Sequence, residues 1–188
     1  MTMLQDIQAG TIPARLTVRD VYQLQAAGLI SEHDHFELVD GEIVPMAAAK
    51  SSPHERMKSQ LIRALAPVAG DARLYVEPTV ALQTDDFAEP DLAVWDKRFA
   101  SEEVDPAAIL LVIEVAVSSL PYDLREKAQR YARAGIRDYW VVDAVRRTVR
   151  VHRAPADGGY REVHEFAADQ AVTPLLLPEN AITLDALD

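Results

Sequence analysis

A single carboxylate inside an apolar run constrains the fold of this chain more than any other feature. Residues 109–117 read ILLVIEVAV, so Glu114 lies between Ile113 and Val115 in a stretch that is otherwise apolar. Such a run is typical of a central β-strand that is covered on both faces. Because a buried carboxylate without a partner is costly, the fold must bring a cation or a metal ion to Glu114.

Asp91 and Lys127 are the candidates to accompany Glu114. Asp91 follows Pro90 at the start of a second apolar stretch, residues 90–96, which predicts a neighbouring strand. Mg²⁺ prefers hard oxygen ligands, typically one or two carboxylates completed by water and substrate phosphate. A lysine beside the attacking water could orient it or stabilise the charge that develops on phosphorus. An Asp, a Glu inside a strand and a nearby Lys are therefore the parts of a divalent-metal phosphodiesterase site.

A helix predicted over residues 122–134 places three polar side chains on one face. Lys127 lies one turn after Asp123 and one turn before Tyr131. By spacing alone, Asp123 and Lys127 could instead form an ordinary exposed ion pair worth a few tenths of a kcal/mol. Glu114 could likewise form a core salt bridge to an arginine, without any metal. These alternatives stay open from the sequence.

His54 begins another predicted helix, residues 53–69, whose apolar residues recur at helical spacing. From that position the imidazole could point toward the edge of the sheet. A lone histidine at a helix start is also commonly a surface or capping residue. The glycine-framed serine elbow of hydrolases is missing, and so are the glycine-rich loops that bind nucleotides.

Turn residues and periodicity predict the remaining elements. Thr17 and Asp20 form a near capping box for a helix that Gly28 ends, and Asp40-Gly41 predicts the turn of a β-hairpin. The other expected elements are an extended segment at 73–83 with an edge or bulge at Pro78, a polar turn at 84–89, strands at 139–143, 148–153 and 160–166, and a C-terminal tail whose apolar pieces pack on the sheet.

Length and composition limit the class of protein. The chain has 188 residues, of which 49% are hydrophobic, and this favours a single domain over 17–188 after a loosely ordered segment, 1–16. The absence of cysteine excludes disulfides and thiolate metal sites and fits a cytoplasmic protein. Neither a signal peptide nor a membrane span is predicted. The net charge of −11 counts against unaided nucleic-acid binding, although basic residues gather in 50–63 and 125–153.

Four stretches together resemble a known family. FELVDGEIVPM, SPHERMKSQLIRAL, EPDLAVW and LVIEVAVSSLPYDLREKAQRYARAGIRDYWVVD are similar to the Uma-type restriction endonuclease family of the PD-(D/E)xK nuclease superfamily. The resemblance covers roughly residues 17 to 170. It implies an α/β fold, namely a restriction-endonuclease-like mixed β-sheet core flanked by helices, preceded by an N-terminal helix and a β-hairpin.

The resemblance also implies a particular site. Asp91 and Glu114 would hold Mg²⁺, for which Mn²⁺ would substitute, and the backbone carbonyl of Val115 would be the third protein ligand. In the superfamily pattern the lysine falls two residues after the second acid, where this chain has Ala116. The family pattern moves the lysine to the following helix, which selects Lys127 as the third catalytic residue. His54, Asp123 and Tyr131 match family positions and are expected to support the site.

Three hypotheses follow for the function. The first is a metal-dependent endodeoxyribonuclease that hydrolyses DNA phosphodiester bonds by metal-activated water. The second is a non-catalytic binding or assembly module on a nuclease fold, which the acidic composition favours. The third is a metal hydrolase of small phosphodiesters. By analogy with restriction nucleases, an edge strand could also pair two copies into a homodimer.

Overall fold

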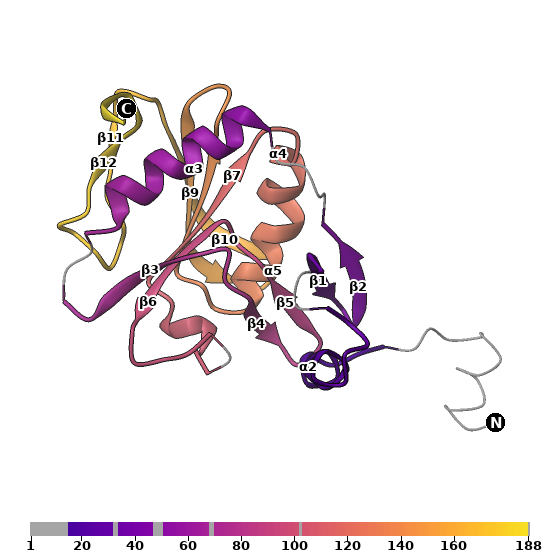
Figure 1. Ribbon diagram of the computed structural model, residues 1–188. Helices are drawn as coiled ribbons and strands as arrows, with labels where there is room; N and C mark the ends of the chain where they lie inside the picture. The colour runs from indigo at the N-terminus through magenta and orange to yellow at the C-terminus, as the bar shows by residue number, and fades with distance from the viewer. Residues whose placement is uncertain (1–14, 32–33, 47–50, 68–69, 102, 188) are drawn as a thin grey trace. The chain divides into compact units, whose positions relative to one another are not determined.

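The computed structural model describes residues 15–31, 34–46, 51–67, 70–101 and 103–187 (Figure 1). The chain divides into two compact units, a smaller one from Met1–Ala48 and Ala81–Ala88 and a larger one from Ala49–Val80 and Glu89–Asp188. The single domain over 17–188 stays a prediction, and most of the segment 1–16 lies outside the described residues. None of the helices in the described ranges has the length and apolar content that crossing a bilayer requires.

Within its described residues, the smaller unit contains helix α2 (Val18–Ala26) and a four-stranded sheet. Helix α2 begins at the predicted capping box, in which the Thr17 hydroxyl accepts a hydrogen bond from the Asp20 backbone and the Asp20 carboxylate accepts one from the Thr17 backbone. The strand order is β2 (Glu42–Pro45), β1 (Phe36–Val39), β5 (Asp86–Ala88) and β4 (Val80–Gln83). The core of the unit consists of Val18, Val21, Phe36, Leu38 and Phe87.

Two predictions in this region need correction. Residues 84–89 do not form a polar turn throughout, because Asp86–Ala88 is the buried strand β5 and Phe87 packs in the core. The acidic residues of this stretch are typical of a turn, although three of its residues form a short buried strand. The extended segment 73–83 divides at Glu77, which has φ +50, into strands that belong to two different sheets. Pro78 follows this break.

The hairpin turn between β1 and β2 supports a stability prediction. Gly41 has φ +80, and an added Cβ would lie 2.8 Å from the Arg15 Cβ. Gly28 has a similar φ of +70 with nothing within 4 Å of the added atom. We expect Gly28→Ala to lower the free energy of unfolding by about 1 kcal/mol through backbone strain alone. Gly41→Ala should lower it by about 2–4 kcal/mol because a steric clash is added. Urea denaturation measures both, and equal losses would contradict the clash.

The larger unit is built on a six-stranded sheet with the order β10-β9-β8-β7-β6-β3. Its strands are β3 (Ala72–Val76), β6 (Leu92–Asp96), β7 (Leu111–Ala116), β8 (Asp138–Asp143), β9 (Thr148–Ala156) and β10 (Gly159–Phe166). Only β7 and β8 are paired in parallel among these strands, so the sheet is mixed, as the sequence predicts. Strand β7 is central and buried at every position.

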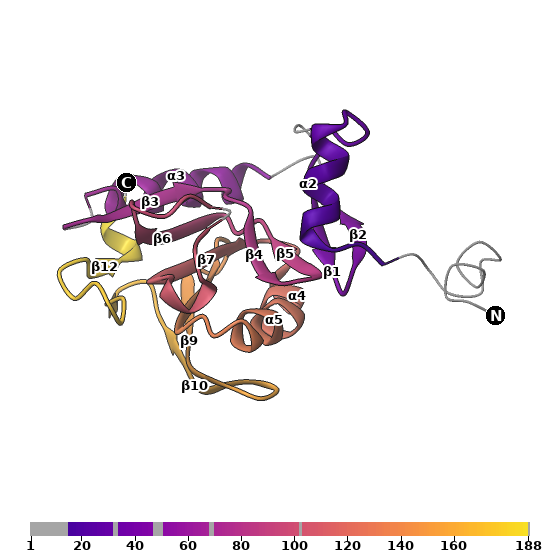
Figure 2. The ribbon, with the colours of Figure 1, turned by 90° about the horizontal axis from the view of Figure 1, so that it is seen from below.

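Helices cover both faces of this sheet (Figure 2). Helix α3 (Ser52–Leu65) packs Met57, Leu61 and Leu65 against one face. The connection from β7 to β8 runs through α4 (Leu120–Tyr122), a π-helical segment (Asp123–Lys127) and α5 (Ala128–Arg133) on the other face. The C-terminal tail, with strands β11 (Ala171–Val172) and β12 (Ile182–Thr183), adds Leu177 and Leu184 to the core beside α3, as predicted.

Candidate active site

Asp91, which directly precedes β6, and Glu114, the fourth residue of β7, lie on two adjacent strands of the sheet. In the antiparallel pair β6–β7, Leu92 stands opposite Ile113, which places Asp91 beside Glu114 at the next position. Both carboxylates are buried, with 7% of Asp91 and 4% of Glu114 exposed. The Asp91 carboxylate accepts a hydrogen bond of 2.9 Å from the backbone N–H of Val115. The structure therefore brings together the two acids that the sequence selects.

The segment after β7 supplies the partners of Glu114. The Oε1 atom of Glu114 accepts hydrogen bonds of 2.8 Å from both the Lys127 ammonium and the Tyr131 hydroxyl. Lys127 is only 6% exposed and Tyr131 is fully buried. A lysine, Lys127, is thus a cation that pairs with Glu114. Asp123 is also buried, so the alternative of an exposed Asp123–Lys127 pair is excluded.

Lys127 is presented from a widened turn of the helix. Residues Asp123–Lys127 are wound as a π-helix, in which the hydrogen bonds span one residue more than in an α-helix. The backbone carbonyl of Asp123 accepts a hydrogen bond of 2.9 Å from Tyr139 on the neighbouring strand β8, which ties this turn to the sheet. Such turns are frequently found at functional sites. The sequence pattern predicted a helix here but carried no signal for the wider winding.

His54 contacts the other carboxylate. Its Nε2 atom lies 3.1 Å from the Asp91 Oδ1 atom, and its Nδ1 atom lies 3.1 Å from the Glu55 Oε1 atom. The histidine therefore reaches the sheet edge from the first turn of α3 and is not a surface residue. His152 on β9 is buried and packs its ring against Tyr139, and burial lowers its pKa to about 4, so it is neutral at pH 7.

Sequence reasoning missed the residues that complete the surroundings of Asp91. The buried Lys58 ammonium lies 2.9 Å from the Glu55 carboxylate and 2.8 Å from the Glu77 carboxylate. The backbone N–H of Glu77 donates to the backbone carbonyl of Asp91 at 3.0 Å, so these contacts close a ring with His54. Lys58, and to a smaller extent His54, hold the pKa of Glu55 below its usual range by hydrogen bonding.

Glu77 was detectable only indirectly. It adopts φ +50, which is uncommon for a residue with a side chain and is often found at functional sites. The sequence signal was the following Pro78, which predicted an interruption of the strand but no contact with Asp91. Lys58 had no signal, because a lysine on a helix is normally solvated.

The oxygen atoms of this site fit a hard divalent cation. A residue in an extended strand directs its N–H and its C=O to the same side, so the Val115 carbonyl points to the side where its N–H meets Asp91. Two carboxylates and one carbonyl are a ligand set that Mg²⁺ accepts, with water and phosphate completing the shell. Within the described ranges, no three side chains of His, Cys, Asp or Glu group as a metal cage. A site for Mg²⁺ here would therefore depend on the Val115 carbonyl.

The sheet order and the flanking helices define a restriction-endonuclease-like α/β protein. A crystal structure described as "a putative nuclease belonging to DUF820" from Anabaena variabilis shares this fold, with a TM-score of 0.69 over 90% of this chain and 96% of that chain, at 18% sequence identity. Residues 18–185 match the model of the Uma2 family, which is described as "Putative restriction endonuclease". The chain belongs to the Uma2 family, and this membership supports a nuclease. No curated protein matches the sequence.

Proposed function

We propose that the protein is a metal-dependent endodeoxyribonuclease that hydrolyses phosphodiester bonds of DNA. The observation that carries the proposal is the buried contact of 2.8 Å between Lys127 and Glu114, next to Asp91 on the adjacent strand. This contact brings a lysine to the two acids, although Ala116 stands where the superfamily pattern has its lysine. Family membership is consistent with this chemistry.

Each residue has a role that its contacts suggest. Asp91, Glu114 and the Val115 carbonyl would hold Mg²⁺ or Mn²⁺, which lowers the pKa of a bound water and neutralises phosphate charge. The hydrogen bond from the Val115 N–H holds the Asp91 carboxylate in place. The Lys127 ammonium is close enough to Glu114 to orient the attacking water or to contact a non-bridging phosphate oxygen.

The neighbouring groups would support these three. The Tyr131 hydroxyl fixes the rotamer of Glu114 through its hydrogen bond of 2.8 Å. His54 orients Asp91, and Asp123 ties the π-helical turn to β8 through its backbone carbonyl. These are positioning roles, because each acts through a residue that would touch the metal or the substrate.

One observation favours a second candidate, a non-catalytic module that binds or assembles. Without any metal, Lys127 already compensates Glu114 and His54 already contacts Asp91, so the buried acids are stable in pairs. The net charge of −11 also disfavours unaided DNA binding. In this case the buried ion pairs would stabilise the fold and would not take part in catalysis.

The decisive experiment measures metal binding and cleavage in the same preparation. We expect the purified chain to nick supercoiled plasmid in millimolar Mg²⁺ or Mn²⁺ and to lose this activity completely in EDTA. Calorimetry should detect metal binding without DNA. Absence of both heat and thermal stabilisation with either cation would refute the nuclease and favour the binding module. Cleavage of bis(p-nitrophenyl) phosphate without plasmid nicking would instead indicate a hydrolase of small phosphodiesters.

A further inference from the structure

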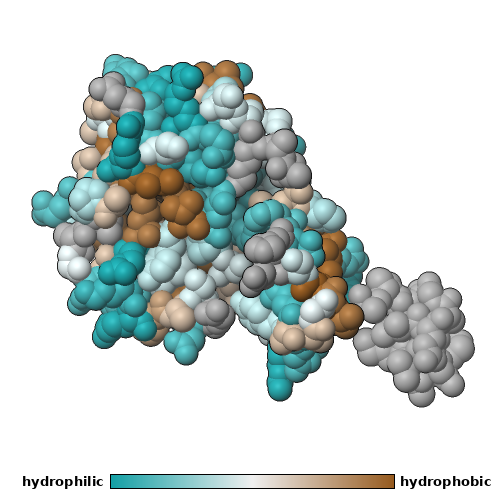
Figure 3. Space-filling model, viewed as in Figure 1, coloured by the Kyte–Doolittle hydropathy of each residue, from teal (hydrophilic) through white to brown (hydrophobic). Residues whose placement is uncertain are grey.

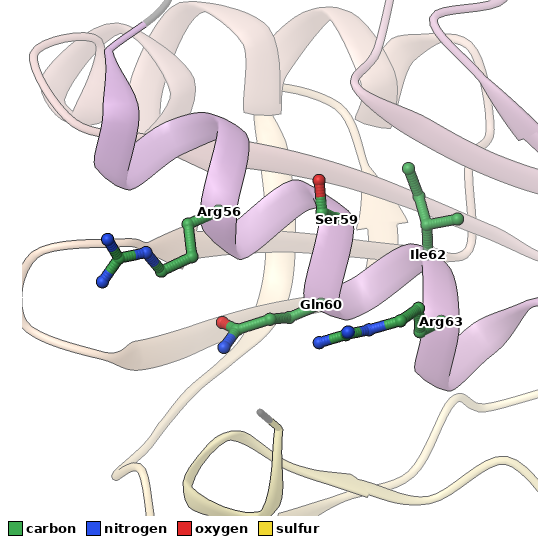
Figure 4. A pocket seen from close by; sticks show the side chains of 5 residues that line it. All are labelled: Arg56, Ser59, Gln60, Ile62 and Arg63. Carbon is green, nitrogen blue, oxygen red and sulfur yellow. The ribbon is translucent and has the colours of Figure 1, made fainter.

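Three residues along one side of α3 are not used by the candidate active site. Arg56, Gln60 and Arg63 follow one another at intervals of four and three residues, which places them on one face of the helix. Figure 4 shows their side chains extending from the same side of α3, whereas Ser59 points to another side. We call these three residues the α3 stripe. The helix that carries it also presents His54 to Asp91.

The stripe borders two neighbouring hollows. One has a volume of about 320 Å³ and is lined by Arg56, Ser59, Gln60, Ile62 and Arg63. The other has a volume of about 230 Å³ and is lined by Ser52, Pro53, Arg56, Met57, Gln60, Ala144 and Arg147. Arg56 and Gln60 line both hollows, and no carboxylate lines either of them. Both hollows therefore present positive charge and no negative charge to a ligand.

The two arginines of the stripe are not neutralised within the structure. Neither Arg56 nor Arg63 has an ion pair or a side-chain hydrogen bond to any residue of the described ranges. The carboxylate of the neighbouring Glu55 contacts Lys58 and His54 and not these arginines. In a chain with a net charge of −11, two uncompensated arginines on one helix face are a local excess of positive charge. In Figure 3, hydrophilic residues surround a hydrophobic patch on the face where α3 lies.

Gln60, which lines both hollows, carries a buried acceptor without a partner. Its side chain is only 9% exposed, and its Nε2 atom donates to the Leu187 carbonyl at 3.1 Å. Its Oε1 atom is buried and has no hydrogen-bond partner. A buried acceptor without a donor costs about 1–3 kcal/mol, so such atoms normally meet a water or a ligand.

We propose that the α3 stripe binds the phosphate backbone of the DNA whose cleavage is proposed above. The rise of an α-helix separates Arg56 from Arg63 by about 10 Å along the axis, so the two guanidinium groups can contact different phosphates of one strand. The stripe shares α3 with His54 but lies on a different side of the helix, because residues two positions apart do not share a helix face. Its contacts with phosphate supply DNA affinity that the acidic chain as a whole lacks.

Fluorescence anisotropy with a labelled DNA duplex tests this inference without any cleavage. The measurements use EDTA and a Glu114→Gln background over a series of NaCl concentrations. We expect Arg56→Gln/Arg63→Gln to weaken binding about tenfold or more and to reduce the slope of log affinity against log salt by about 2. The matched control is Arg98→Gln/Arg161→Gln, which removes the same charge from exposed positions elsewhere. This control should leave the slope within about 0.5 of the parent.

The outcomes separate this inference from the proposed function. Equal slopes for the two double variants, or no salt-dependent binding by the parent, would overturn the role of the α3 stripe. A parent that binds DNA with the expected slope but never cleaves it with Mg²⁺ or Mn²⁺ would overturn the nuclease and leave the stripe in place. Unchanged thermal unfolding of the Arg56→Gln/Arg63→Gln variant would confirm that a changed slope does not arise from misfolding.

Discussion

Glu114→Gln is expected to lower the rate of Mg²⁺-supported plasmid nicking by about 10³-fold or more. A bound metal's stabilisation of charge in the transition state is worth several kcal/mol, and this variant removes one of the two carboxylates proposed to hold the metal. Glutamine keeps the size of the side chain and can still accept hydrogen bonds from Tyr131 and Lys127. Calorimetry should show the loss of metal affinity together with the loss of activity.

Glu162→Gln is the control for this experiment, since Glu162 is an exposed glutamate on β10. It should retain the full rate. If Glu114→Gln nicks plasmid as fast as Glu162→Gln, the activity belongs to a contaminant or to another part of the chain. If metal binding is lost while the rate stays unchanged, Glu114 holds a metal that the reaction does not need.

Lys127→Met is expected to reduce both activity and stability. It removes the ammonium proposed to act on the water or the phosphate, which should cost about 10²–10³ in rate. It also leaves the Glu114 carboxylate, 4% exposed, without its cation. Removing one partner of a buried pair typically costs about 3–5 kcal/mol, so we expect the free energy of unfolding in EDTA to fall by about 3 kcal/mol. Urea denaturation monitored by circular dichroism measures this loss.

The metal and a second substitution give this prediction two further readouts. Mn²⁺ should restore part of the lost stability, because the cation then compensates Glu114 in place of the lysine. Lys127→Met/Glu114→Gln should be more stable than Lys127→Met alone, because no buried charge is left unpaired. A cost as small as that of Lys97→Met, which breaks a half-exposed pair with Asp71, would show that Lys127 and Glu114 do not depend on each other.

Local sequence signals account for much of the fold. The Asp40-Gly41 turn, the Thr17 capping box and the apolar run around Glu114 each depend on a few consecutive residues, and each is confirmed in the structure. The strand Asp86–Ala88 was missed because three residues are too few to show a periodicity. The interruption at Glu77 was anticipated at Pro78, but its consequence, the division of one extended stretch between two sheets, depends on tertiary pairing.

The sequence by itself determined that Glu114 is buried in a central strand and that a cation must accompany it, because the cost of burying a lone charge does not depend on the topology. Together with the family pattern it also selected Asp91 and Lys127. Only the tertiary structure decided that Lys127 pairs with Glu114 at 2.8 Å from a π-helical turn. It also decided that the Glu77 backbone contacts Asp91 and that Lys58 pairs with Glu77. These contacts join residues that are distant in sequence. They depend on strand register and helix packing, which no local sequence pattern encodes.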